Sequence, residues 1–309
     1  MIALHRSRAA LVALALILLT GSAFAWDATG HMVVTRIAWM RLSPATRARV
    51  VALLAQAPAD AGLASLRPAA SSTDADLMFT AYASTWPDIV RAQEPAARHA
   101  YHRPIWHYIN WFWREGPDHT VVPVPGLEPD SITIVVELAR QGAIVADTTA
   151  PAADRAVALA WVLHLGGDIA QPLHASGRVT DQSPRGDHGG NDFHLDSAMS
   201  LHWYWDRILT ARYPRSDAES DDAYIARVAD AVMAHAPADS TMWMWQPDPF
   251  ERWAKESLLA AQTQVYCCGV AQGVAAPPEY LAHTDQTSEP RIALAGYRLA
   301  ALLTKLLGP

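Results

Sequence analysis

Along most of this 309-residue chain, apolar residues recur at the three- and four-residue spacing of an amphipathic helix, and convincing strand alternation is scarce. We therefore expect an all-α protein. The pattern predicts helices over residues 30–42, 45–56, 72–85, 131–146, 152–169, 197–213, 221–235, 249–266 and 290–307. Two stretches rich in glycine, proline or polar residues, 116–129 and 176–191, are expected to be loops. With no internal repeat or low-complexity linker, one helical domain is the simplest organisation.

The first 25 residues have the three parts of a secretory signal peptide. A basic start (His5, Arg6, Arg8) precedes an apolar run from Ala9 to Leu19, and the small-residue motif Ala23-Phe24-Ala25 follows. The run of about eleven residues is too short to span a bilayer, which needs ~20. We expect cleavage after Ala25, a mature domain of residues 26–309 without a membrane anchor, and a periplasmic or secreted location.

The charge balance restricts how this chain would attract a substrate. Removal of Arg6 and Arg8 leaves 22 Lys and Arg against 31 Asp and Glu, a net charge of −9. An acidic chain attracts polyanions poorly at long range. If the substrate carries phosphate, bound metal rather than a basic surface must neutralise it.

Cleavage after Ala25 would make Trp26 the N-terminal residue. A free α-amino group titrates near ~8 and, once neutral, is a competent nitrogen ligand for a metal. His31 follows five residues later. The processed terminus and His31 are therefore candidates for one half of a zinc site.

Two His/Asp pairs have the spacing that places both side chains on one helical face. They are His164 with Asp168 and His202 with Asp206, and His174 follows the first pair by six residues. Imidazole and carboxylate together favour zinc. One such pair alone is more often a surface or supporting hydrogen bond, but two pairs among apolar and aromatic residues favour a metal site, because charged groups seldom lie on apolar helices without partners.

Two further candidates are weaker when taken singly. Asp88 follows Trp86-Pro87, where an Asp is usually part of a turn, and His107 lies between aromatic residues, where a His is usually part of the core. The other histidines have no comparable partner and are expected to be solvated or structural: His99, His102, His119, His188, His194, His235 and His283. Of these, His188 and His194 flank the glycine-rich loop and could line a site.

Taken in order, these elements resemble the zinc-dependent, single-strand-specific class I nucleases of the S-one/P-one type. The matching elements are Trp26 with His31, Trp86-Pro87-Asp88, Trp106-His107-Tyr108-Ile109, His164-Leu165-Gly166-Gly167-Asp168, Gln171-Pro172-Leu173-His174, the loop 186–191, and His202 with Asp206. The resemblance covers essentially the whole mature chain. It implies an all-helical fold with a trinuclear zinc cleft.

The resemblance also implies a role for each matched position. One zinc ion would be bound by Asp88, His107, His164 and Asp168; a second by Trp26, His31 and the bridging Asp168; a third by His174, His202 and Asp206. Asp88 and Asp168 are the expected catalytic residues. The implied activity is cleavage of P–O3′ bonds in single-stranded DNA and RNA and in 3′-nucleotides, leaving 5′-phosphorylated products. No protein partner is implied.

Three residues are candidates for contacting the substrate. Tyr108 matches an aromatic position on which a base would stack, and Asn191 lies in the glycine loop. Asn110 stands where better-known members carry an acidic residue; since Asn both donates and accepts hydrogen bonds, base contact remains available.

Two alternatives use the same ligands. Zinc-dependent phospholipase C shares the fold, the terminal Trp and three zinc ions, but its last ligand motif typically ends in Glu where this chain has Asp206. A secreted, non-catalytic zinc-binding relative is the other alternative. The adjacent Cys267 and Cys268 could form a vicinal disulfide, remain unpaired or pair with another chain, and we assign them a structural role.

Overall fold

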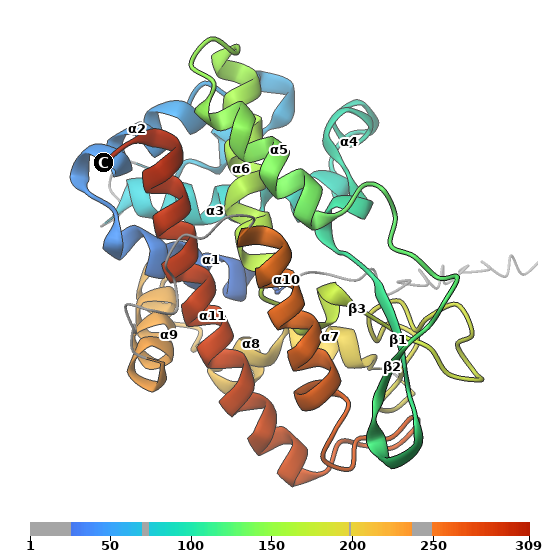
Figure 1. Cartoon of the computed structure of the whole chain (residues 1–309). Helices are drawn as coiled ribbons and strands as arrows, with labels where there is room; N and C mark the ends of the chain where they lie inside the picture. Colours follow the sequence, from blue (N-terminus) through green and yellow to red (C-terminus); the bar gives the residue numbers. More distant parts are fainter. Residues whose placement is uncertain (1–25, 70–73, 198, 237–248) are drawn as a thin grey trace, which may run out of the picture.

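Helices make up most of the computed structural model, which describes residues 26–69, 74–197, 199–236 and 249–309 (Figure 1). The α-helices of these ranges are α1 (Ala28–Arg41), α2 (Pro44–Leu54), α3 (Ala75–Ile89), α4 (Pro95–Tyr101), α5 (Ile134–Ala146), α6 (Ala152–Asp168), α7 (Leu201–Asp206), α8 (Ile208–Arg212), α9 (Asp221–His235), α10 (Pro249–Ala260) and α11 (Pro278–Leu307). The prediction of an all-α fold is confirmed. The predicted signal peptide lies outside the described residues.

The core is built around α1 and α6. In α6 every residue from Ala158 to Asp168 is buried, and a helix that is apolar on nearly all sides belongs in the interior of a protein. α1 packs against α3, α6, α9 and the long α11, which crosses the molecule in Figure 1. The two central helices therefore carry their polar residues into the interior, where partners must come from other elements.

A small sheet is present where the sequence predicted no strand, and two of its three strands lie in predicted loops. β1 (Trp111–Glu115) pairs antiparallel with β2 (Val121–Pro123) and parallel with β3 (Ser176–Arg178), in the order β2-β1-β3. The loop prediction is therefore wrong over parts of 116–129 and 176–191. Strands of three to five residues are too short for their alternation to be seen in the sequence.

Several helix boundaries also differ from those predicted. α3 does not stop at Trp86-Pro87 but continues through Pro87 to Ile89, where the missing backbone N–H costs one hydrogen bond in the last turn. α11 begins at Pro278 rather than Pro290, which lies inside it.

The region predicted as one helix over 197–213 contains two short helices, α7 and α8, separated at Arg207. Over 249–266, α10 ends at Ala260 and a π-helical turn (Ala261–Val265) follows. The start of α2 is as predicted, because Ser43 caps it by accepting from the Thr46 N–H at 3.0 Å and Pro44 occupies the first turn.

In the described part of the chain, no helix combines the length and apolar character needed to cross a membrane.

Candidate metal centre

Asp168, at the end of α6, is surrounded by three imidazole rings from three different elements. His31 Nε2 lies 3.2 Å from Asp168 Oδ1, and His107 Nδ1 and His164 Nε2 lie 3.0 and 3.1 Å from Oδ2. The side chains of His31, His164 and Asp168 have no exposed surface. His31, from α1, stacks on His164 with ring centroids 4.0 Å apart.

Asp88 joins this group from the last turn of α3. The ligand atoms of Asp88, His31 and His164 lie within 4.8 Å of one another, and so do those of His107, His164 and Asp168. We call these five residues the α6 cluster. The fold thus brings together the His and Asp residues predicted for the first two zinc ions, with Asp88 placed next to His31 as well as His164.

A second group, the α7 cluster, consists of His174, His202 and Asp206. All three side chains are buried, and their ligand atoms also lie within 4.8 Å of one another. His202 and Asp206 are one turn apart on α7, with Nε2 3.4 Å from Oδ2. His174 comes from the short 3₁₀ helix Pro172–Ala175 that follows α6. This is the grouping predicted for the third zinc ion.

Backbone carbonyls orient three of the histidines. Nδ1 of His164 lies 2.8 Å from Ser84 O, Nδ1 of His174 lies 2.6 Å from His107 O, and Nδ1 of His202 lies 2.7 Å from Gly189 O. A carbonyl can only accept, so each Nδ1 carries a proton, and in the neutral form of the ring Nε2 has its lone pair toward the cluster. That is the tautomer a metal-binding imidazole requires.

Gly189 and Gln171 support the α7 cluster. Gly189 has φ +62°, and a Cβ at this position would lie 2.4 Å from Leu173 O, so a larger residue would displace the carbonyl that orients His202. The Gln171 side chain donates from Nε2 to Asp206 Oδ1 at 2.7 Å. The two contacts orient His202 and Asp206 and leave His202 Nε2 and Asp206 Oδ2 available for a metal ion.

Trp26 lies between the two clusters. Its buried indole donates from Nε1 to Gly167 O at 3.1 Å, beside Asp168, and the next backbone N–H, that of Asp27, donates to Asp206 O at 2.8 Å. The start of the described chain is therefore attached to α6 and α7 at once.

Burial and neighbouring charge shift the pKa values of the α6 cluster. Burial alone raises the pKa of Asp168, but the three histidines outweigh it and hold that pKa well below its usual value. Burial lowers the pKa of His164, yet the negative charges of Asp168 and Asp88 raise it to about 9. Burial lowers the pKa of His31. Without metal, the α6 cluster therefore contains an ion pair between protonated His164 and Asp168.

In the α7 cluster burial dominates. It lowers the pKa of His174 to about 3 and raises that of Asp206 well above its usual value, although the hydrogen bond from Gln171 partly offsets the second shift. Without metal, His174 is therefore expected to be neutral near pH 7, and burial disfavours the ionised form of Asp206.

The donor atoms fit a zinc-type cation. Among the described residues, the buried side-chain atoms without a hydrogen-bond partner include His174 Nε2, Asp168 Oδ1 and Asp206 Oδ2. A buried unsatisfied polar group costs about 1–3 kcal/mol, so several converging at one place indicate a ligand that satisfies them. Imidazole nitrogen and carboxylate oxygen are the ligands expected for zinc.

A cavity of about 330 Å³ lies against both clusters. It is lined by Asp88, Arg91, His102, Pro104, His107, Tyr108, Asn110, Leu173, His174, His188, Gly189, Asn191 and His202. The three predicted substrate-contacting residues, Tyr108, Asn110 and Asn191, are thus at the same cavity as four of the predicted ligands.

Arg91 and His102 also line this cavity, although neither was predicted from the sequence as a site residue. Arg91 follows Asp88 by three residues, a same-face spacing that could have indicated it. His102 was expected to be solvated or structural, and no feature of the sequence pattern distinguished it as a residue that lines the cavity. His188 also lines the cavity, which agrees with the prediction made from its position beside the glycine-rich loop.

Three histidines expected to have no comparable partner do have one. Nδ1 of His188 lies 2.6 Å from Asp192 Oδ2, at the same i, i+4 spacing as the two predicted pairs. His119 contacts Glu115, and His235 Nδ1 lies 2.5 Å from Glu289 Oε2. The expectation that these residues lack a partner was wrong, but all three side chains are more than half exposed, as expected of solvated histidines. Unlike these exposed pairs, the two predicted pairs are buried among further histidines.

A family model described as S1/P1 Nuclease matches residues 26–308, nearly the whole chain. The chain belongs to the S1/P1 nuclease family. Membership identifies it as a hydrolase that acts on phosphodiester bonds, with nucleic acid as the substrate class. A comparison of this S1/P1 nuclease with curated proteins gave no match.

Proposed function

We propose that this S1/P1 nuclease uses three zinc ions to cleave P–O3′ bonds in single-stranded DNA and RNA and in 3′-nucleotides, leaving 5′-phosphorylated products. The observation that carries the proposal is the convergence of the α6 and α7 clusters at one cavity, with buried ligand atoms that have no hydrogen-bond partner among the described residues. Family membership supports the reaction class.

The ligands would form three sets, two of which share Asp168. Asp88, His107, His164 and Asp168 would bind one; the amino group and carbonyl of Trp26 with His31 and Asp168 a second; His174, His202 and Asp206 the third. Bound zinc supplies Lewis acidity that lowers the pKa of water and neutralises charge on a phosphoryl group. Asp168, which contacts three histidines from three elements, would bridge the first two ions, so it is the residue on which the α6 cluster depends.

The charges of the site support phosphate binding. Three zinc ions with Asp88, Asp168 and Asp206 would leave about +3 locally, despite the acidic chain. Arg91 adds a cation to the cavity lining. Phosphate would therefore be attracted at short range by the cavity rather than by the outer surface.

The cavity favours an unpaired nucleotide. A volume of about 330 Å³ is at the lower end of small-molecule sites, so a single base and phosphate fit where a duplex does not. Half-buried Tyr108 offers a ring for base stacking, and burial raises its pKa, so the phenol stays neutral. Asn110 and Asn191 offer amides for hydrogen bonds to base or phosphate.

Hydrolysis of defined oligonucleotides tests the proposal. Zinc-loaded protein comprising residues 26–309 is incubated with matched single-stranded and duplex DNA, with and without a chelator, and the products are identified by mass spectrometry. We expect chelator-sensitive cleavage of the single strand to 5′-phosphorylated products, with the Asp168→Asn variant as the inactive control. Chelator-resistant cleavage would overturn the zinc assignment, and 3′-phosphorylated products would overturn the bond assignment. Release of phosphocholine from lipid with the DNA left intact would favour the phospholipase alternative.

We further propose that residues 1–25 are a signal peptide, that the mature domain spans 26–309, and that the protein is periplasmic or secreted. The attachment of Trp26 to both clusters supports a terminus at this residue. A protein that retains Ala25 should contain fewer zinc ions than one that begins at Trp26, because its amide nitrogen cannot serve as an amine ligand. Equal zinc content would contradict the ligand role of Trp26.

A further inference from the structure

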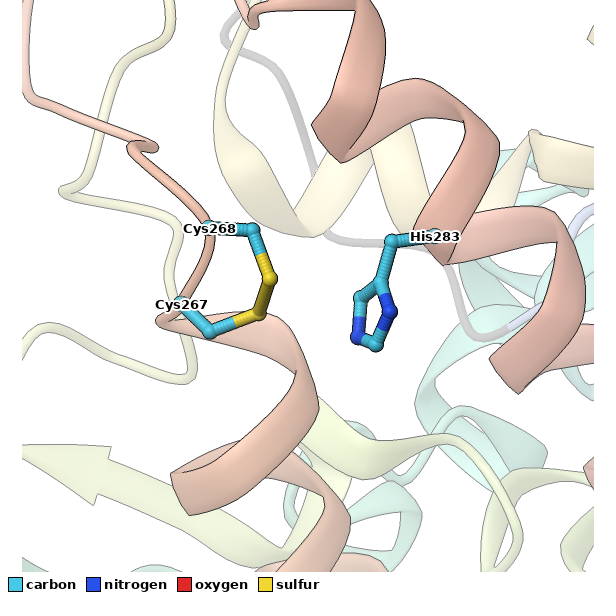
Figure 2. A group of neighbouring side chains, drawn as sticks. All are labelled: Cys267, Cys268 and His283. Carbon is cyan, nitrogen blue, oxygen red and sulfur yellow. A yellow bond between two sulfur atoms is a disulfide. The ribbon is translucent and has the colours of Figure 1, made fainter.

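The only two cysteines of the chain lie beside a histidine from another element. Cys267 and Cys268 are joined as a disulfide, one of the alternatives that the sequence left open. Figure 2 shows the ring of His283, on α11, facing the two sulfur atoms. The two sulfurs and a ring nitrogen of His283 lie within 4.8 Å of one another.

The packing of α11 determines this arrangement. Tyr280, fully buried on α11, donates its hydroxyl to Val265 O at 2.9 Å, two residues before Cys267. Tyr280 and His283 are three residues apart and therefore share a helical face. The hydrogen bond that attaches α11 to the π-helical turn thus also directs His283 toward the cysteines.

A tight turn holds the cysteine pair. The Val270 N–H donates to Cys267 O at 3.1 Å, and both central residues, Cys268 and Gly269, have positive φ (57° and 78°). Positive φ at both central positions is the pattern of a type I′ turn. Cys268 is exposed and Cys267 half-buried, so a reductant can reach the bond from solvent.

His283 Nε2 itself indicates a ligand. It is a buried side-chain atom without a hydrogen-bond partner among the described residues. Buried polar atoms are nearly always paired, so an unpaired imidazole nitrogen next to two sulfurs needs a partner that the oxidised pair does not supply. Sulfur in a disulfide is a poor ligand, because the thiolate is the form that binds metal.

We propose that reduction of the Cys267–Cys268 disulfide creates a second, separate metal site, in which two thiolates and His283 bind a thiophilic closed-shell ion, Cu⁺ or Zn²⁺. A dithiol reductant would supply the two electrons. Its thiolate attacks one sulfur, the S–S bond breaks, and its second thiol resolves the mixed disulfide. The protein is left with two thiols and the reductant with a disulfide; binding of the ion then releases the thiol protons.

The donor set separates this site from the nuclease centre. Two thiolates and one imidazole favour soft ions, whereas the α6 and α7 clusters contain imidazole and carboxylate only. With metal–sulfur distances of about 2.3 Å and metal–nitrogen distances of about 2.0 Å, tetrahedral donors are ~3.5–3.8 Å apart. Because the three donor atoms already lie within 4.8 Å of one another, binding requires the two sulfurs to move apart once the S–S bond is broken and a small movement of the His283 side chain or the turn.

Metal uptake by the zinc-loaded full mature chain tests the proposal. The protein is treated with a phosphine, which reduces the disulfide and takes up the oxygen of water as its oxide, and free thiols are counted in the native state. Cu⁺ affinity is then measured by competition with a bathocuproine chelator, and zinc per chain is measured before and after reduction. Two variants are compared with the wild type: the double variant Cys267→Ser/Cys268→Ser and the single variant His283→Gln. The matched control is His99→Gln, because the His99 side chain is exposed on α4.

We expect reduced wild-type protein to bind one additional ion per chain, with thiolate-to-copper absorption in the Cu⁺ arm. The double serine variant should bind none, His283→Gln should bind about tenfold more weakly, and His99→Gln should match the wild type. Uptake in only one arm would assign the ion and support the site. The proposal is overturned if native protein yields no thiols, if neither ion is taken up beyond the serine variant, or if His283→Gln retains full affinity. Single-strand hydrolysis by the cysteine variants, which is expected to be unchanged, verifies that they are folded.

Discussion

Asp168 and Asp206 occupy the same local motif and have opposite electrostatic environments. Each carboxylate follows a histidine by four residues on a helix and is buried. Asp168 lies within 3.2 Å of three imidazoles, and its pKa is well below the usual value. Asp206 has one histidine at 3.4 Å and one amide donor, and its pKa is well above the usual value.

The i, i+4 spacing of His and Asp therefore creates a chelating helical face but does not determine whether the carboxyl group on that face is ionised. Burial penalises both carboxylates, and only the number of neighbouring cationic or donating groups decides whether the penalty is overcome. The α6 cluster therefore has its own internal ion pair without metal, whereas in the α7 cluster burial disfavours the ionised form of Asp206, which a bound cation would favour.

The largest effect on stability is expected for Asp168→Asn. Loss of the carboxylate leaves protonated His164 buried without its partner, so we expect the free energy of unfolding of the metal-free protein to fall by about 3–5 kcal/mol in urea titrations. The depressed pKa of Asp168 contributes stability above about pH 4, and the raised pKa of His164 contributes stability that is lost as the pH rises through about 9. The effect should therefore diminish below pH 4 and above pH 9. An unchanged free energy at pH 6 would refute the ion pair.

Removal of zinc from the wild type should have the next largest effect. Because the metal would bind only the folded chain, chelation is expected to lower the melting temperature by at least about 5 °C. Differential scanning calorimetry with and without chelator measures this, and readdition of zinc is the control. If the melting temperature did not change, the clusters would not bind metal in the folded protein.

Gln171→Leu examines the support of the α7 cluster alone. Gln171 contacts Asp206 and is not in the cavity lining, so its loss should weaken zinc binding at this cluster by about 10–100-fold. Gln141→Leu is the matched control: Gln141 is also buried and donates to a carboxylate, that of Glu137 at 2.9 Å, but on α5. Chelator competition on both variants measures the affinity, and equal losses would indicate general destabilisation instead.

The smallest effect, and one of opposite sign to Asp168→Asn, is expected for Asp206→Asn in metal-free protein. A raised folded pKa means that the contribution of Asp206 to stability is present below about pH 4 and is lost as the pH rises. Asn avoids this loss and can still accept from Gln171, so the metal-free variant should be about 1 kcal/mol more stable than wild type at pH 7. Urea unfolding from pH 4 to pH 8 should show the gain increasing with pH. A destabilised variant at pH 7 would remove the contrast with Asp168.

Much of the fold and of the candidate site was predictable from the sequence. Helical periodicity indicated the all-α fold, and the His/Asp spacing indicated the two chelating faces, because both are local properties of a helix. The three-stranded sheet and the continuation of α3 through Pro87 were not predictable, since short strands and a proline in a last turn depend on tertiary partners.

The local spacing places His164 with Asp168, and His202 with Asp206, on one helical face whatever the rest of the fold. Their other neighbours depend on tertiary packing, which brings His31 and His107 to Asp168, Gln171 to Asp206, and His283 to the cysteines. The physical reason is range. Backbone periodicity acts over one or two helical turns, whereas desolvation, charge and coordination depend on every group within a few ångströms, whatever its position in the chain.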